Sequence, residues 1–520
     1  MLNTLPKFVI DYLKRIKRDE LTINSFLLTF LTLVVIRTLL EFAFESGHFL
    51  SLNSSFYYIV VDYIHIFISW LTLYFCISFI LSFFSNNSFF DTLKITLKFF
   101  GIIIIVPLLD YFLFESGKIV YNYHFDNFWF SFMNTFNPFV ELSFATKGVR
   151  VEIALVLLFA YLFVYIETQK HSNAFFSSLL IYGIIYLYGY LPALYNALFF
   201  TSFKEILNLS YLASKSDVQF NLYLYLPIAV LLFLGVLKQC SKNIQATIID
   251  SLRLERFSIY MGLFVFGFLV VLKQNSIAFE VINLFDMQKF FLALLSLLLL
   301  FAYSTILNNI YDQEIDRISN QERPLVKDYI QVQMYHQIKN SFLFFALLCA
   351  LSVNEQFFLL SLFIFSLSYI YSAPPLRLKK HFVTANLILS SIAVTVFLLG
   401  FSLVEANMSF INSNKILLLF IFAFVFISAN IKDIKDIQGD KKEGVTTLVI
   451  LLGEEKTMWI IKSSALICLV LFLYLLSFGL LFELLLVTLF LLLSVLIKES
   501  ERYLLCLQLI AVIVYVAFLL

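Results

Sequence analysis

The sequence predicts an all-α integral membrane protein, and three observations support this fold class. Hydrophobic residues make up 61% of the 520 residues, whereas only 14% are charged. Soluble globular domains are closer to half apolar and a quarter charged, so this apolar surplus requires a bilayer as its main solvent. The apolar residues fall into runs long enough to cross a membrane as helices, and the loops between these runs alternate in basic charge.

The composition argues against several other classes of protein. The net charge of +1 gives no overall field that would attract nucleic acid, so no nucleic-acid partner is expected. The five cysteines are scattered without a CxxC pair, and the six histidines form no HxxxH or HExxH pair. We therefore expect neither a disulfide framework nor a zinc site.

The first half of the chain, residues 1–240, is predicted to be a membrane domain of about six spans whose function is unknown. Its apolar runs lie near residues 22–42, 57–84, 95–115, 151–168, 174–200 and 221–238. The basic residues before the first run are expected to stay in the cytoplasm, because the run is too long for a cleavable signal and lacks a small-residue cleavage site. Residues 241–257 are predicted to form a basic cytoplasmic linker.

The first half also contains polar groups inside its apolar runs. Arg37 and Glu41 are four residues apart and can pair on one helix, while Asp62, His65 and Asp110 lie in later runs. In lipid such groups should meet inside the bundle. We favour a structural ion-pair network over a path for substrate or protons.

The second half, residues 258–520, is predicted to be a bundle of about nine spans. The runs lie near residues 259–275, 288–308, 338–354, 356–372, 384–404, 415–431, 458–477, 481–497 and 503–520. Lys and Arg concentrate in the loops after the second, fourth, sixth and eighth runs, so these loops should face the cytoplasm. The expected location is the plasma membrane, with several passes.

Two acidic stripes at this cytoplasmic side carry the chemical signal. Asn308, Asp312 and Asp316 are spaced by four residues after the second run, so they line one face of a continued helix. Asp436 and Asp440 repeat this spacing after the sixth run. Magnesium takes oxygen ligands and is commonly held by one or two carboxylates together with substrate phosphates. Solvated helix ends would explain one such stripe, but two stripes favour a site for Mg²⁺ and a diphosphate.

Three segments resemble, in order, the signature regions of the UbiA superfamily of intramembrane prenyltransferases. They are NNIYDQEIDR with the RPL that follows it, YSAPPLRLK, and KDIKDIQGDKKEGVTTL. They follow the second, fourth and sixth of the nine runs, and the resemblance covers roughly half of the chain, from Arg256 to Leu520. It implies a nine-helix UbiA-like bundle, preceded here by the additional bundle of about six helices.

The resemblance also implies roles for particular residues. The implied magnesium ligands are Asn308, Asp312, Asp316, Asp436 and Asp440, and the four aspartates together with Tyr371 would be catalytic. The implied substrate-binding residues are Asn308, Asn309, Arg323, Arg377, Lys379 and Lys441. Two positions depart from the family pattern: Asn309 stands where many members have Asp, and Lys432 occupies the first position of the second acidic motif, with Asp433 beside it.

The function implied by the resemblance is transfer of a prenyl group from a prenyl diphosphate to a hydrophobic acceptor in the membrane, with Mg²⁺-assisted release of diphosphate. The acceptor is either a quinone-type aromatic ring or a glycerol-phosphate ether-lipid precursor. An alternative is a non-catalytic or transport membrane protein that binds isoprenoid lipid phosphates, which would account for the extra spans. The intact aspartates favour the enzyme.

Overall fold

The structure is a computed structural model, and the part of the chain that it describes is mainly helical. The described residues are 7–41, 43–44, 63–114, 124–125, 128–142, 145–200, 211–212, 215–240, 243–275, 284–404, 415–434, 436–442, 444–476, 484 and 487–492. The strands within them, β1 (His124–Phe125) and β2 (Tyr211–Leu212), pair antiparallel. The chain divides into two compact units, Met1–Lys242 (unit 1) and Asn243–Leu520 (unit 2), and each is described by itself.

Eleven described helices are long and apolar enough to cross a membrane, six in unit 1 and five in unit 2. The chain is therefore an integral multi-pass membrane protein, as predicted. The predicted run 415–431 is a shorter apolar helix, and the run 458–477 lies in a helix outside these eleven. The last two predicted spans, 481–497 and 503–520, lie mostly outside the described residues.

Unit 1 is arranged around the helix α4 (His65–Ser85). The other helices of this unit are α1 (Lys7–Arg18), α2 (Ile23–Glu41), α5 (Phe89–Phe100), η4 (Gly101–Ile104), α6 (Ile105–Phe112), α7 (Phe128–Asn134), α8 (Lys147–Thr168), α9 (His171–Phe200) and α11 (Lys215–Cys240). Helix α4 contacts α2, α5, α8, α9 and α11. Aromatic side chains fill part of this core, where the Phe30 and Phe100 rings stack with centroids 4.5 Å apart.

A buried ionic network joins α2 to α8 in unit 1. Arg37 Nε donates to Glu41 at 2.9 Å, and its terminal nitrogen lies 3.2 Å from Glu152. The Arg37 guanidinium also lies over the Trp70 ring, 4.4 Å from its centroid. The predicted pairing of Arg37 with Glu41 is confirmed, whereas Asp62 lies outside the described residues.

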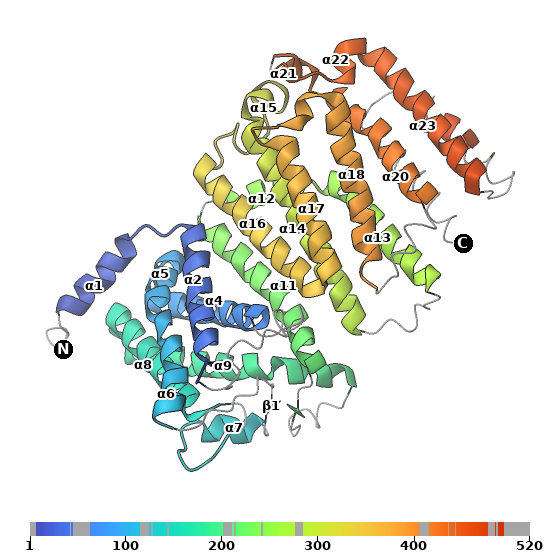
Figure 1. Ribbon diagram of the computed structural model, residues 1–520. Coiled ribbons are helices and arrows are strands. Elements are labelled where there is room, and N and C mark those ends of the chain that lie inside the picture. The colour runs from blue at the N-terminus through green and yellow to red at the C-terminus, as the bar shows by residue number, and fades with distance from the viewer. Residues whose placement is uncertain are drawn as a thin grey trace. The chain divides into compact units, whose positions relative to one another are not determined.

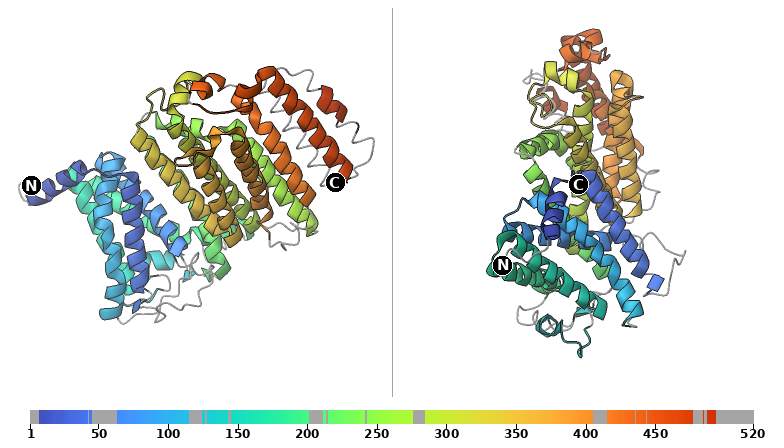
Figure 2. Two further views of the ribbon diagram at one scale, coloured as in Figure 1. Left: turned by 45° about the horizontal axis from the view of Figure 1, so that its top comes forward. Right: turned by 90° about the vertical axis from the view of Figure 1, so that its left-hand side faces the viewer.

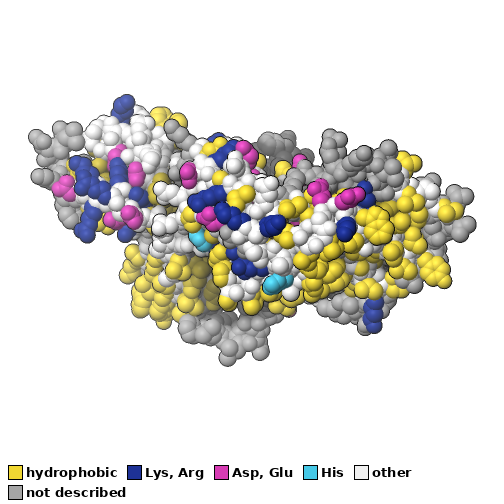
Figure 3. All heavy atoms as spheres, turned by 90° about the horizontal axis from the view of Figure 1, so that it is seen from above, with side chains coloured by type: hydrophobic (Ala, Val, Ile, Leu, Met, Phe, Trp, Pro, Cys, Tyr) yellow, Lys and Arg dark blue, Asp and Glu magenta, His cyan; other side chains and the backbone are white. Residues whose placement is uncertain are grey.

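Unit 2 is a bundle of long helices with short helices gathered at one end. Its elements are α12 (Ile244–Leu252), α13 (Leu254–Gln274), α14 (Leu284–Tyr311), α15 (Gln313–Ser319), α16 (Val332–Val353), α17 (Glu355–Ser372), η6 (Leu378–Lys380), α18 (Phe382–Phe401), α20 (Lys415–Ser428), η7 (Ala429–Ile434), α21 (Ile437–Lys442), α22 (Leu448–Leu452) and α23 (Glu454–Leu476). The helices α15, α21 and α22 lie together at the end of unit 2 that is uppermost in Figure 1, and the left view of Figure 2 shows the same grouping. We call this the polar end, because charged side chains gather over it in Figure 3.

Two glycines allow the close crossing of α13 and α18. A Cβ atom on Gly267 would collide with the backbone carbonyl of Phe397, and one on Gly400 would collide with that of Phe264. Small residues permit such close backbone approach between membrane helices, where dispersion contacts replace the hydrophobic effect as the driving force. This crossing therefore fixes the position of α13 relative to α18 within unit 2.

Residues 244–252, within the predicted linker, form the helix α12, which contacts α14. At the other side of the polar end, the chain after α21 pairs with the loop after α17. Thr446 N–H donates to the Lys380 carbonyl at 2.8 Å, and Phe382 N–H donates to the Thr446 carbonyl at 3.0 Å. These backbone bonds fix the loop that carries Lys379 beside the segment that carries Asp436 and Asp440.

Candidate active site

A pocket of about 330 Å³ lies within unit 2 and extends from the polar end into the bundle. Its deeper wall is apolar, with side chains such as Leu263, Leu297, Ile392 and Val396 from the helices α13, α14 and α18. Its outer wall holds the acidic and basic side chains. Ligand pockets commonly combine an apolar lining with a few polar groups in this way.

The first acidic stripe continues through a break between two helices. Helix α14 ends at Tyr311, and Asp312 has φ −103° and ψ 13° before α15 begins. The Asp312 N–H still donates to the Asn308 carbonyl at 2.9 Å, and the Asp316 N–H donates to the Asp312 carbonyl at 2.8 Å. Because the four-residue hydrogen bonding persists, Asn308, Asp312 and Asp316 all line the pocket.

The second acidic stripe packs closely against the first. Asp440 N–H donates to the Asp436 carbonyl at 2.8 Å, so the two aspartates are one helical turn apart, and both line the pocket. Between them, a Cβ atom on Gly439 would lie 2.7 Å from Ser319 Oγ and 2.9 Å from Ile315 Cγ2. Only a residue without a side chain lets α21 approach α15 so closely.

Two cations contact the first stripe from the loop after α17. The Lys379 ammonium pairs with the Asp312 carboxylate and donates to Asn308 Oδ1 at 3.0 Å. Arg377 donates to Asp312 Oδ1 at 3.1 Å and to the Tyr311 carbonyl at 2.8 Å. Arg377 has φ 41° and ψ 54°, a left-handed conformation that is costly for a residue with a side chain. The loop thus places two positive charges on one carboxylate.

Asp316 lies in an environment that disfavours its charged form. Burial and the neighbouring Asp312 carboxylate raise its pKa to about 6, although Arg323 and the Asn320 amide act in the opposite direction. A cation placed between the stripes would reverse this effect, because it would favour the ionised carboxylate.

The donor set of the pocket fits magnesium. Within the described residues, no three His, Cys, Asp or Glu side chains converge closely enough to hold a metal ion by themselves. Magnesium, however, usually binds through one or two carboxylates and completes its octahedron with water and phosphate oxygens. Amide and carboxylate oxygens line the pocket at Asn308, Asp312, Asp316, Asp436 and Asp440.

The structure brings most, but not all, of the predicted site residues to the pocket. Tyr371, Arg323 and Lys379 line it together with the acidic stripes, and Arg323 also pairs with Asp250 at 3.1 Å. Arg377 does not line the pocket, but it donates a hydrogen bond to Asp312, which does. Lys441 is exposed on α21 and lies outside the pocket lining.

Asn309 points away from the acidic stripe. It is only 1% exposed, and its amide donates to the Tyr335 hydroxyl at 3.0 Å. Its Oδ1 accepts a hydrogen bond of 2.6 Å from Arg253. As the residue after Asn308, Asn309 lies on a different side of α14, so its side chain contacts Arg253 and Tyr335 and does not line the pocket.

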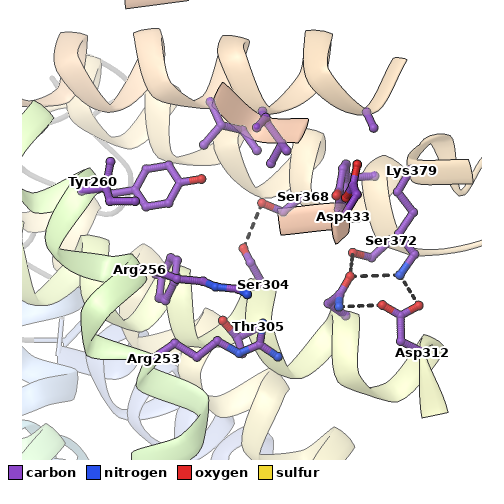
Figure 4. Close-up of a pocket in the computed structure, with 18 of the residues that line it drawn as sticks. Arg253, Arg256, Tyr260, Ser304, Thr305, Asp312, Ser368, Ser372, Lys379 and Asp433 are labelled. Carbon is purple, nitrogen blue, oxygen red and sulfur yellow. Dashed lines mark hydrogen bonds and ion pairs between the residues drawn. The ribbon is translucent and has the colours of Figure 1, made fainter. Parts of the chain in front are cut away.

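Sequence reasoning assigned no role to several polar residues of the pocket lining, among them Arg253, Arg256, Asn320 and Asp433. Figure 4 shows Arg253 and Arg256 on one side of the pocket, and Asp312 with Lys379 on the other. For Arg253 and Arg256, their position in the sequence could have indicated a place in the site. Both arginines directly precede or begin the first span of unit 2, at the same membrane side as the acidic stripes.

Comparison with known proteins finds a family model, curated relatives and solved structures that resemble part of this chain. The model of the UbiA prenyltransferase family matches residues 261–506. Digeranylgeranylglyceryl phosphate synthase from Sulfolobus acidocaldarius is 33% identical over 172 residues, which are 33% of this chain and 60% of that protein. The 2-acylphloroglucinol 4-prenyltransferase of Humulus lupulus is 32% identical over 183 residues, which cover 33% of this chain and 44% of that protein.

Among solved structures, a UbiA homolog from Archaeoglobus fulgidus bound to DMAPP and Mg²⁺ is 21% identical. The match covers 52% of this chain and 97% of that chain, with a TM-score of 0.41. The chain spans less than two thirds of the length of the two curated relatives named above. The match to the family model lies within unit 2. The second half of the chain, over residues 261–506, is a domain of the UbiA prenyltransferase family.

Proposed function

We propose that the chain is a prenyltransferase that moves a prenyl group from a prenyl diphosphate to a hydrophobic acceptor within the membrane. The observation that carries this proposal is the contrast between the two parts of the pocket. The two acidic stripes and Lys379 line its outer part, where Arg377 contacts Asp312 from outside the lining, whereas the deeper wall is apolar. A prenyl diphosphate has the same division into a charged head and an apolar chain.

In the proposed reaction, the bond between C1 of the prenyl chain and the diphosphate oxygen breaks, and diphosphate leaves with the electron pair. C1 then forms a bond to the acceptor, which releases one proton to solvent. Mg²⁺ bound to Asn308 and the four aspartates would neutralise charge on the departing diphosphate. Lys379, Arg377 and Arg323 would stabilise its remaining oxygens through charge-assisted hydrogen bonds.

The apolar wall has its own part in the proposed reaction. An allylic cation formed at C1 would react with water if water were present, so the acceptor captures it only in a dry pocket. Tyr371, which lines the pocket at the end of α17, is positioned to close this space or to steady the cation. The names of the two relatives include both a glyceryl-phosphate product and an aromatic acceptor, so both acceptor classes fit the family.

The test is turnover by the purified full-length protein in lipid nanodiscs. Labelled geranylgeranyl diphosphate is incubated with Mg²⁺ and a panel of aromatic and glycerol-phosphate acceptors. We expect diphosphate release together with an equal amount of a new prenylated lipid. Tight binding of the donor without release of diphosphate would support the alternative of a non-catalytic or transport protein.

We further propose that the polar end faces the cytoplasm and that the protein lies in the plasma membrane. The basic loops on this side support the orientation. Exposed positions suited to a labelling test are Glu314 and Lys442 at the polar end, and Glu355 at the start of α17 at the opposite end. In a cysteine-free background, an impermeant thiol reagent on intact cells should label Glu355→Cys and spare the other two.

A further inference from the structure

Two arginines line the pocket on the side opposite Asp312 and Lys379. Arg253 lies between α12 and α13, Arg256 lies in the first turn of α13, and Figure 4 shows both of them near Tyr260. Arg253 has φ 35° and ψ 59°, in the left-handed region that a residue with a side chain rarely occupies. Costly backbone conformations of this kind concentrate at functional sites.

The Arg253 guanidinium forms no ion pair with a carboxylate in the described part of the chain. Its terminal nitrogen donates to Oδ1 of Asn309 at 2.6 Å, and Asn309 is an uncharged amide. Its Nε atom is buried and has no hydrogen-bond partner. The neighbouring Arg323, by contrast, is paired with Asp250 at 3.1 Å.

The surroundings of Arg253 disfavour its positive charge. Burial, followed by the nearby guanidinium groups of Arg323 and Arg256, lowers the pKa of Arg253 to about 10, although Asp250 and Asp316 act in the opposite direction. Arg256 is exposed, and its side chain forms no hydrogen bond or ion pair with the described part of the chain. Two guanidinium groups on one pocket wall can thus receive an anion, and arginine is well suited to bidentate contacts with phosphate.

From this arrangement we propose that Arg253 and Arg256 form a subsite for the phosphate group of the acceptor, separate from the site of the prenyl diphosphate. The inference rests on the prenyl transfer proposed above and selects between its two acceptor classes. The acceptor is then a phosphate monoester of a lipid alcohol. Its phosphate lies against Arg253 and Arg256, and its free hydroxyl lies toward Asp312, across Ser304 and Thr305 in Figure 4.

An uncharged phenol fits this wall less well. It would cover the two arginines without supplying an anion, which leaves charged groups desolvated and unpaired. Asn309 keeps the subsite positive, because an aspartate at this position would place a carboxylate beside Arg253 and neutralise it. In the transfer, the acceptor hydroxyl oxygen bonds to C1 of the prenyl chain, the C1–O bond to diphosphate breaks, and the hydroxyl proton leaves to solvent.

The experiment uses the full-length protein in nanodiscs with saturating geranylgeranyl diphosphate and Mg²⁺. The acceptors are a glycerol phosphate that carries one geranylgeranyl ether, the same lipid without its phosphate, and a neutral alkylphenol. We expect the wild-type protein to prefer the phosphorylated lipid by about 10-fold or more in kcat/KM, since only this acceptor can form charge-assisted hydrogen bonds with the two arginines.

Four variants localise the effect. Arg253→Gln, Arg256→Gln and Asn309→Asp should each raise the KM for the phosphorylated acceptor about 10-fold and leave the KM for the donor unchanged. Arg317→Gln is the matched control, because Arg317 is an exposed arginine that pairs with Glu314 on α15, outside the pocket. It should behave as the wild type. Arg256 is exposed, so its replacement tests the subsite even if the half-buried Arg253 proves necessary for folding.

Binding of the phosphorylated lipid in the absence of donor separates this inference from the proposed function. If the wild type binds the phosphorylated lipid but not its alcohol, and Arg256→Gln loses this preference, the subsite stands even where no transfer occurs. Equal use of the neutral alkylphenol would overturn the proposal. So would an increase in the donor KM of Arg256→Gln without any change in acceptor KM, because these arginines would then bind the diphosphate.

Discussion

Asp316 and Asp436 accept hydrogen bonds from the same side-chain amide, although they belong to different segments of unit 2. Asn320 Nδ2 donates to Oδ1 of each carboxylate at 3.0 Å. One amide can reach both oxygens only because α21 lies directly on α15, at the close approach that Gly439 permits. Asn320 is therefore a positioning residue that sets the spacing between the two acidic stripes.

Replacement of Asn320 by alanine should impair metal use without removing a proposed metal ligand. We expect kcat to fall about 10-fold or more, because two hydrogen bonds to carboxylates are lost at about 1.5–3 kcal/mol each. The Mg²⁺ concentration for half-maximal activity should rise at the same time. Gln321→Ala is the control, since this neighbouring amide is exposed and lies outside the pocket lining. An unchanged Mg²⁺ response in Asn320→Ala would contradict the positioning role.

The aspartates themselves should be indispensable. Asp312→Ala and Asp436→Ala each remove an oxygen donor from the pocket, and we expect turnover to fall by more than about 100-fold, the scale on which loss of one electrostatic group affects a transition state. Glu314→Ala removes the same charge from an exposed position on α15 and should leave turnover near the wild-type level. Thermal unfolding in detergent checks that the variants are folded. Retained turnover in both aspartate variants would refute the metal assignment.

Activity should depend on a small divalent cation. Mg²⁺ or Mn²⁺ should support prenyl transfer, and excess chelator should abolish it. Ca²⁺ should substitute poorly, because it takes more ligands at longer distances than the compact octahedral ions. The measurement is the rate of diphosphate release after removal and return of each ion. Full activity in chelator would rule out the proposed metal requirement.

The crossing of α13 and α18 predicts a strong effect of one methyl group on stability. Gly400→Ala should lower the unfolding temperature in detergent, since overpacking at a tight contact costs about 1–3 kcal/mol. Gly262→Ala is the matched control: it lies in α13, nothing lies within 4 Å of its added Cβ, and alanine favours a helix. Its unfolding temperature should stay equal or rise. Equal unfolding temperatures for the two variants would mean that the close contact is absent in the membrane protein.

The sequence predicted the parts of the fold that depend on local pattern. The span Asp286–Tyr311 overlaps the predicted run 288–308, because a long apolar run bounded by charge determines a membrane helix without reference to its partners. The four-residue spacing of Asp312 and Asp316 likewise placed both on one pocket wall, since hydrogen bonding of helical type continues through the break after Tyr311.

Features that depend on contacts between distant segments could not be predicted in the same way. Asn309 was expected to bind substrate together with Asn308, but adjacent helical residues face different directions. The hydrogen-bond partner of Asn309, Arg253, comes from a segment that was expected to be a linker. Nothing in the local sequence shows that Asn320 joins Asp316 to Asp436, because this requires the packing of α15 on α21. Lys441 follows Asp440 directly, yet it lies on the exposed side of the same short helix.

The final prediction concerns where the catalytic unit begins. We expect a chain that starts at Asn243, the first residue of unit 2, to retain donor binding and metal-dependent diphosphate release. The pocket lining lies between Arg253 and Thr447, so such a chain contains all of it. A chain that starts at Ser258 would also keep the acidic stripes, but it would lose α12 and the two arginines Arg253 and Arg256.

The two truncated chains should therefore differ in the acceptor and not in the donor. Both should release diphosphate if they fold, whereas only the longer chain should prefer the phosphorylated acceptor. Loss of α12 also removes the buried partners of Asn309 and Tyr335, so the shorter chain should unfold at a lower temperature. Size-exclusion profiles and unfolding temperatures establish which chains are folded. A folded chain from Asn243 that cannot bind prenyl diphosphate would show that unit 1 supplies part of the donor site.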